Sequence, residues 1–135
     1  MATVIASIQG EDGLWRPGLL DAADYPNPEI SGSSFFVYAM AWGIDRHVLD
    51  KKVYLPVVER GWRGLVKHIY ADGRLGDIQP IGAAPGAYTP SSSYVFGTGA
   101  FLLAGSEVRQ IASHAKTNAG RSETKILKHD LAEHR

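Results

Sequence analysis

The sequence predicts an all-α fold that forms part of a helical repeat array. One observation is a loop that occurs twice: the segment 11–17 (EDGLWRP) returns in outline at 71–76 (ADGRLG). The interval of roughly sixty residues is what a pair of helices and its connections require. A second observation is the order of three helix-length segments. The first and third are apolar enough to be inner helices, and the second is half polar, as an outer helix would be. Since the 135 residues hold little more than one full unit, we expect the chain to be a portion of something larger.

The first predicted helix covers residues 35–44 (FFVYAMAWGI), after the turn-forming segment 26–33 (PNPEISGS). It is apolar on every side, and a helix with no polar face belongs inside a protein. Residues 35–38 are also rich in β-forming side chains, so a strand there is the alternative.

The second predicted helix, at 53–69, is amphipathic and half exposed, with charged residues opposite one apolar stripe. That stripe consists of Tyr54, Val58, Trp62, Leu65 and Ile69. The third, at 94–105, is again apolar all round, and its three glycines favour close contact between helices. A strand at 94–96 is the alternative there.

The composition changes after Val108, and we expect residues 1–111 to form the barrel-like portion and 112–135 a polar tail, helical or disordered. Fourteen basic residues balance fourteen acidic ones, so no net charge draws the chain to nucleic acid or to an anionic membrane. We expect neither as a partner. No window approaches the ~20 apolar residues that span a bilayer, and the N-terminus lacks a basic signal-peptide region, so a cytoplasmic location is predicted.

The sequence predicts no cofactor. With no cysteine the chain has no disulfide and no thiolate metal site. The five histidines do not show a metal-ligand spacing, so no metal site is predicted.

Several motifs, in order and with similar spacing, resemble those of the unsaturated rhamnogalacturonyl hydrolases, glycoside hydrolase family 105, which is allied to the family 88 unsaturated glucuronyl hydrolases. The resemblance covers about residues 9–111 and falls on the C-terminal third of the family pattern. The motifs are DGLWRP (12–17), LLD (19–21), YP (25–26), Glu29, SGS (31–33), AWGI (41–44), DGRLG (72–76), QPIG (79–82) and GTGAFLLAGSEV (97–108).

The resemblance implies an incomplete (α/α)6 barrel of alternating inner and outer helices. It also implies a reaction in which an aspartate protonates the C4=C5 double bond of a terminal unsaturated galacturonyl residue. Water then adds at C5, and the resulting hemiketal opens and releases rhamnose. Such vinyl-ether hydration does not need the paired carboxylates of ordinary glycosidases.

The family's catalytic aspartate lies upstream of the matched portion, so no catalytic residue is predicted here. We expect a C-terminal fragment of such a hydrolase, active in pectin degradation when completed by the rest of the barrel and inactive alone. Its partner would be an unsaturated galacturonyl-rhamnose oligosaccharide. The alternative is a non-catalytic helical module that binds carbohydrate or completes another chain's barrel, and the apolar inner helices favour self-association.

The predicted substrate-binding residues lie on the loops before the first apolar helix. Trp15 could stack on a sugar ring and Arg16 could pair with a uronate carboxylate, or both could anchor the loop. Glu29, Ser31 and Ser33 lie where the chain enters the helix, at the end that faces the mouth of such barrels. Helix capping by the serines is the alternative there.

Other candidates are assigned structural roles. Asp12 and Asp72 precede glycines and are expected to be turn residues. Asp21 and Asp24 have no partnering base and are expected to be exposed. The serine run 91–93 is expected to cap the third helix, since it lacks the frame of a nucleophile elbow.

Overall fold

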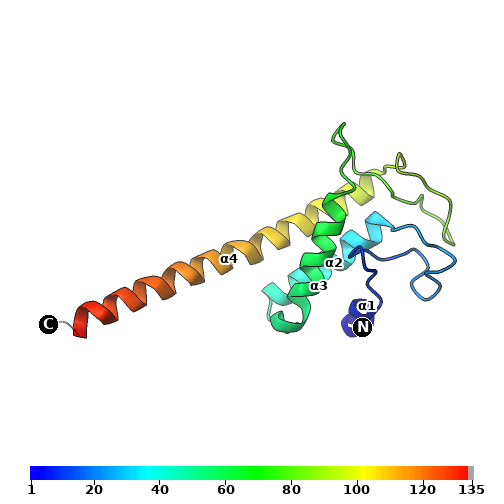
Figure 1. Cartoon of the computed structure of the whole chain (residues 1–135). Coiled ribbons are helices and arrows are strands. Elements are labelled where there is room, and N and C mark those ends of the chain that lie inside the picture. The colour runs from blue at the N-terminus through cyan, green and yellow to red at the C-terminus, as the bar shows by residue number, and fades with distance from the viewer. Residues whose placement is uncertain (134–135) are drawn as a thin grey trace.

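The computed structural model describes residues 1–133, with side chains through residue 115. It contains four helices: α1 (Ala2–Ser7), α2 (Ile30–Asp45), α3 (Lys51–Val66) and α4 (Val95–Glu133). Helix α2 packs against both α3 and α4, and the C-terminal half of α4 extends away from the other helices (Figure 1). Within residues 1–133, β-pairing is confined to one isolated bridge between Ile69 and Leu75, so the predicted all-α fold is confirmed.

Both strand alternatives were wrong. Residues 35–38 are in the middle of α2 and residues 95–96 begin α4. Their β-forming side chains are accommodated because helix packing, rather than intrinsic propensity, decides the state of apolar segments.

Helix α2 begins five residues earlier than the predicted Phe35, because Glu29 caps it. The Glu29 carboxylate accepts hydrogen bonds from the backbone N–H groups of Ser31 and Gly32. Helix α3 begins at Lys51 behind the cap Asp50 and ends at Val66, three residues before the predicted Ile69. The chain is already in the second loop by Ile69, which pairs with Leu75.

Two features of the helices were not predicted. Helix α1 is a single short segment of six residues, too brief for a periodicity to show. Helix α4 has 39 residues and continues through positions 111 and 112 without a break. The boundary that we expect between a barrel-like portion at 1–111 and a polar tail at 112–135 remains a prediction. No helix described in residues 1–133 has the length and apolar character needed to cross a membrane.

The first Asp-Gly loop is a tight turn. Gly13 N–H donates to the carbonyl of Gly10 at 2.9 Å, and Gly10 N–H donates to that of Leu14 at 2.9 Å. The Asp12 carboxylate accepts from Leu14 N–H at 3.0 Å, and Gly13 has a φ of 85°.

The second loop repeats this geometry sixty positions later. Gly73 N–H donates to the carbonyl of Tyr70 at 2.8 Å, and Tyr70 N–H donates to that of Arg74 at 2.9 Å. The Asp72 carboxylate accepts from Arg74 N–H at 3.0 Å, and Gly73 has a φ of 82°. Each loop follows one helix and precedes another, so the predicted repeat and the turn roles of both aspartates are confirmed.

The core lies between the first loop and the three longer helices. Leu14, Ile30, Val37 and Leu65 are at most 1% exposed. The helices predicted to be inner are not covered on all sides by the described residues: Phe35 and Trp42 of α2 and Leu102 of α4 are 48%, 40% and 65% exposed. These side chains leave an apolar surface open on both helices.

Candidate functional site

A small cavity of ≈ 150 Å³ lies at the N-terminal end of α2, where the first loop meets the segment after the second. It contains four of the five predicted substrate-binding residues, and the fifth, Ser31, hydrogen-bonds Glu29 in its lining. The lining residues are Trp15, Arg16, Pro17, Leu19, Glu29, Gly32, Ser33, Phe36 and Gln79.

Trp15 anchors the first loop to the core. Its side chain is almost fully buried, its indole N–H donates to the carbonyl of Ile5 at 2.7 Å, and its ring meets Phe36 edge-on at 5.3 Å. Ser33 is also buried: its hydroxyl accepts from Trp15 N–H at 2.9 Å and donates to the Trp15 carbonyl at 3.4 Å. This geometry holds the loop against α2 and leaves the indole face to the core rather than to a sugar.

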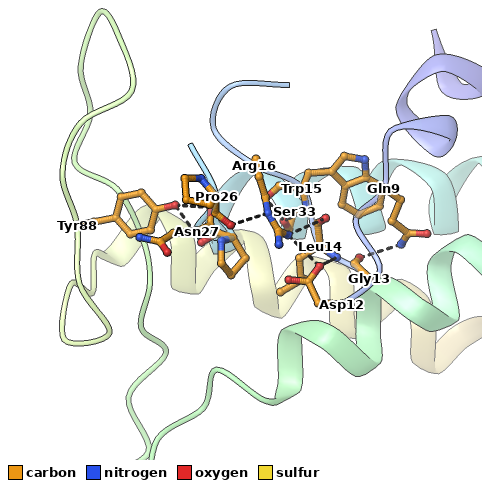
Figure 2. A network of polar contacts seen from close by, with 11 residues as sticks. Gln9, Asp12, Gly13, Leu14, Trp15, Arg16, Pro26, Asn27, Ser33 and Tyr88 are labelled. Atoms are coloured by element: carbon orange, nitrogen blue, oxygen red, sulfur yellow. Dashed lines mark hydrogen bonds and ion pairs between the residues drawn. The ribbon is translucent and has the colours of Figure 1, made fainter. Parts of the chain in front are cut away.

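Arg16 is fixed in place by several acceptors (Figure 2). Its Nη1 pairs with the Asp12 carboxylate at 2.8 Å and its Nε donates to the carbonyl of Pro26 at 2.9 Å. Burial by itself would raise the pKa of Asp12, but the hydrogen bonds from Arg16 and Leu14 N–H, with the charge of Arg16, lower that pKa from its ordinary value. A uronate carboxylate would therefore have to compete with Asp12 for the guanidinium.

Glu29 is buried, and its carboxylate is saturated by donors. Oε1 accepts from the N–H and hydroxyl of Ser31 at 3.1 and 2.9 Å and from Gln79 N–H at 3.2 Å. Oε2 accepts from Gly32 N–H at 2.6 Å. The prediction that serines cap this helix was wrong, because the longer side chain of Glu29 reaches the free N–H groups of the first turn and Ser31 donates to it instead.

The serine run 91–93 was expected to cap the third predicted helix, now α4, but Ser92 has another role. Its hydroxyl accepts from Thr89 N–H at 2.9 Å, within the turn that precedes α4. The run therefore shapes the connection rather than the helix end at this residue.

Tyr88 ties the glycine- and proline-rich connection at 79–90 to the first loop. Its hydroxyl donates to the carbonyls of Asn27 and Pro28 at 2.8 and 3.1 Å (Figure 2). Burial, and secondarily the negative charges of Glu29 and Asp77, raise the pKa of Tyr88 to about 12. The phenol is thus a neutral donor at physiological pH.

Sequence reasoning missed a second polar cluster behind the cavity. The buried Asp77 carboxylate accepts from the Tyr70 hydroxyl at 2.5 Å and is paired with His68 Nδ1 at 2.7 Å. The hydrogen bond to Asp77 raises the pKa of Tyr70 to about 12. No local pattern marks these three residues, since a loop brings them together. Gln79 was also missed, although it belongs to the quoted QPIG motif.

A larger open groove of ≈ 790 Å³ lies at the other end of α2 and contains none of the predicted site residues. Its lining includes Asp45 and His114, whose Nδ1 lies 3.1 Å from an Asp45 carboxylate oxygen. The imidazole is 65% exposed, so this pair is a surface contact of little energetic weight. The smaller cavity contains the Arg16 guanidinium, which is held in place, and buried polar groups, so it is the better candidate for a binding site.

Comparisons with known proteins identify the family to which the chain is similar. The sequence profile of Glycosyl Hydrolase Family 88 matches residues 1–112. The unsaturated 3S-rhamnoglycuronyl hydrolase of Formosa agariphila is 45% identical over 111 residues, which are 82% of this chain and 29% of that protein.

Solved structures give the same result. A family 88 glycosyl hydrolase from Bacteroides vulgatus superposes with a TM-score of 0.74 at 40% identity, over 79% of this chain and 32% of that one. A possible GH105 member from Salmonella enterica superposes with a TM-score of 0.68 at 25% identity, over 82% of this chain and 30% of that one.

The chain thus spans less than a third of the length of each of these proteins. The all-helical structure matches part of their (α/α)6 barrel-type fold, and the predicted resemblance to families 105 and 88 is confirmed. With a match over residues 1–112, the chain belongs to Glycosyl Hydrolase Family 88.

Proposed function

We propose that residues 1–111 form one wall of the substrate cleft of an unsaturated uronyl hydrolase, and that the cavity at the N-terminus of α2 contacts the sugar. The observation that carries the proposal is the 45% identity to an unsaturated 3S-rhamnoglycuronyl hydrolase. The substrate class is an unsaturated uronyl unit joined to rhamnose, the galacturonyl form in the case of pectin degradation. Trp15, Arg16, Glu29 and Ser33 line the cavity, Ser31 hydrogen-bonds Glu29, and Arg16 is the one charged donor in the lining.

The wall binds and positions substrate but does not supply the proton donor. Glu29 is the carboxylate in the cavity lining, and its oxygens already accept from the donors of Ser31, Gly32 and Gln79. A carboxylate held in this way serves as a helix cap and loop anchor rather than as a general acid. The isolated 135-residue chain is therefore inactive, and protonation of the C4=C5 double bond falls to an aspartate on another part of the barrel.

The test is to incubate the chain with an unsaturated galacturonyl-rhamnose disaccharide and follow the absorbance of the double bond. The Formosa agariphila relative, with an unsaturated 3S-rhamnoglycuronyl substrate, serves as the positive control for the assay. We expect no loss of absorbance with the chain alone, but saturable binding of the disaccharide by calorimetry or NMR. Turnover by the chain would overturn the claim that it lacks the proton donor. Absence of binding would overturn the claim that it forms part of the substrate cleft.

A second candidate function is a non-catalytic helical module that binds carbohydrate or completes another chain's barrel. The exposed apolar side chains on α2 and α4 favour it, since they form a surface suited to a helical partner. Self-association through these helices is the simplest form of this function.

A further inference from the structure

Gln79 has an unpaired polar atom beside the cavity. Among the residues whose side chains are described, its Oε1 is the one buried side-chain nitrogen or oxygen with no hydrogen-bond partner. Buried polar atoms are nearly always paired in folded proteins, by protein groups, water or a ligand. Gln79 also lines the cavity, so a molecule that enters there is one way to supply the missing partner.

The backbone around Gln79 is fixed on three sides. Gln79 N–H donates to Glu29, Ile78 N–H donates to the Ser92 carbonyl at 3.0 Å, and Ile30 N–H donates to the Asp77 carbonyl at 3.1 Å. The side chain therefore starts from an immobile position. Because the terminal torsion of a glutamine is soft, the amide can turn its oxygen toward the cavity without moving the loop.

The backbone of Asp77, two residues before Gln79, has an unusual conformation. It has a φ of 56°, in the left-handed region that few residues other than glycine adopt, and the His68 and Tyr70 side chains hold its carboxylate there. Such strained residues persist where the surroundings over-determine them, and they cluster at functional sites. The strain lies two residues from Gln79 and sets the path of the chain into the cavity.

The charges in the lining disfavour an anionic ligand. Asp12 already neutralises Arg16, and Glu29 contributes a carboxylate to the same lining. Among the described side chains and backbone, no group accepts from Arg16 Nη2, which leaves its two N–H groups for a neutral oxygen. A hydroxyl group fits both needs, because it donates to the Gln79 oxygen and accepts from the guanidinium.

The size and walls of the cavity suit one sugar unit. Its ≈ 150 Å³ corresponds to the liquid volume of about five water molecules, far below the 300–1,000 Å³ of a drug-sized site. Pro17, Leu19 and Phe36 provide apolar surface for a ring face or a methyl group.

We infer that this cavity is a subsite for a neutral, hydroxyl-bearing sugar unit, with Gln79 as its hydrogen-bond acceptor and Arg16 as a donor. The inference deepens the proposed function, on which its choice of ligand rests: the cavity takes the rhamnose side of the substrate, and the unsaturated uronate lies elsewhere in the cleft. This reverses the expectation that Arg16 pairs with the uronate carboxylate.

The experiment is an NMR titration of the ¹⁵N-labelled 135-residue chain with L-rhamnose and, separately, with D-galacturonate. We expect the Gln79 side-chain amide signals to shift saturably with rhamnose, and rhamnose to bind more tightly than galacturonate. Gln79→Met, which keeps the length of the side chain but removes the amide, should weaken rhamnose binding about tenfold. Gln110→Met, at an exposed glutamine of α4, should leave binding unchanged.

Thermal unfolding separates a binding effect from a folding effect. Because Oε1 of Gln79 makes no hydrogen bond in the protein, Gln79→Met should unfold at a temperature no lower than that of the parent chain. Equal rhamnose affinity in Gln79→Met, or galacturonate binding at least as tightly as rhamnose, would overturn the inference, and so would a lack of rhamnose binding. Binding of the unsaturated disaccharide in the same chain would then show that the proposed cleft stands while this subsite does not.

Discussion

Tyr88 shows how a single residue joins two loops at the cavity. Its hydroxyl hydrogen-bonds two carbonyls of the first loop, so Tyr88→Phe removes the only side-chain tie described between the segments 79–90 and 26–28. We expect a loss of about 1 kcal/mol in the free energy of unfolding at pH 7, the usual size of a net hydrogen bond. Urea denaturation of Tyr88→Phe measures it, with Tyr25→Phe, at a partly exposed tyrosine, as the control.

The same residue predicts a dependence on alkaline pH. Burial, together with the negative charges of Glu29 and Asp77, raises the pKa of Tyr88 to about 12, from the ordinary value of 10.0 that a tyrosine has in the unfolded chain. A raised pKa contributes stability that is fully present below pH 10 and is lost as the pH rises toward 12. The free energy of unfolding should therefore fall less steeply over this window in Tyr88→Phe than in the parent chain. Parallel pH profiles of the two would contradict the assignment.

At the scale of elements, the two Asp-Gly loops form a matched pair. Gly13 and Gly73 both have φ values near the left-handed helical region, at 85° and 82°. A Cβ at Gly13 would overlap the carbonyl oxygen of Arg60 in α3, whereas a Cβ at Gly73 would meet nothing within 4 Å. The first loop is packed against a helix and the second is open to solvent.

Alanine substitution should separate these two situations. Gly73→Ala should cost about 1–2 kcal/mol, the strain of a left-handed alanine, while Gly13→Ala should cost several kcal/mol, because α3 must also move away. Chemical denaturation of the two variants gives the comparison. Equal losses would mean that the contact between the first loop and α3 contributes no stability.

The cap of α2 is a second prediction about an element. Glu29→Ala would leave buried N–H groups of Ser31, Gly32 and Gln79 without an acceptor, so we expect a loss of about 2 kcal/mol or more. Glu29→Gln keeps one acceptor oxygen and should lose less. Denaturation curves of both variants test this order. A Glu29→Gln variant as unstable as Glu29→Ala would point to the charge rather than to the acceptor as the stabilising feature.

The elements also show what the sequence could and could not reveal. The apolar length of the run 35–44 and the helical period of the run 53–69 are local signals, so α2 and α3 were predicted to within five residues at each end. The start of α2 was misplaced because Pro26 and Pro28 indicate a turn, and because glutamate is not one of the usual N-cap residues although Glu29 caps this helix. The predicted cavity residues were found through motifs, but Asp77 and its partners meet only through a long connection.

At the scale of the whole molecule, α2 and α4 carry apolar side chains that no described part of the chain covers. Phe35, Trp42, Val95 and Leu102 are between 40% and 90% exposed. At about 25 cal/mol per Å² of apolar surface, covering such side chains is a considerable driving force for association. Single exposed apolar residues are ordinary, but here they occur on two helices that pack against each other.

We therefore predict that the 135-residue chain self-associates as its concentration rises, and that Leu102→Gln shifts the equilibrium toward the monomer. Leu102 is 65% exposed on α4, so the substitution removes apolar surface without opening the core. Leu20→Gln is the matched control, since Leu20 is 85% exposed but lies on the loop before α2 and not on either helix. Sedimentation velocity across a dilution series gives the distribution of species. A chain that remains monomeric at every concentration would show that these faces do not drive association, and an equal effect of Leu20→Gln would show that their position on the two helices is irrelevant.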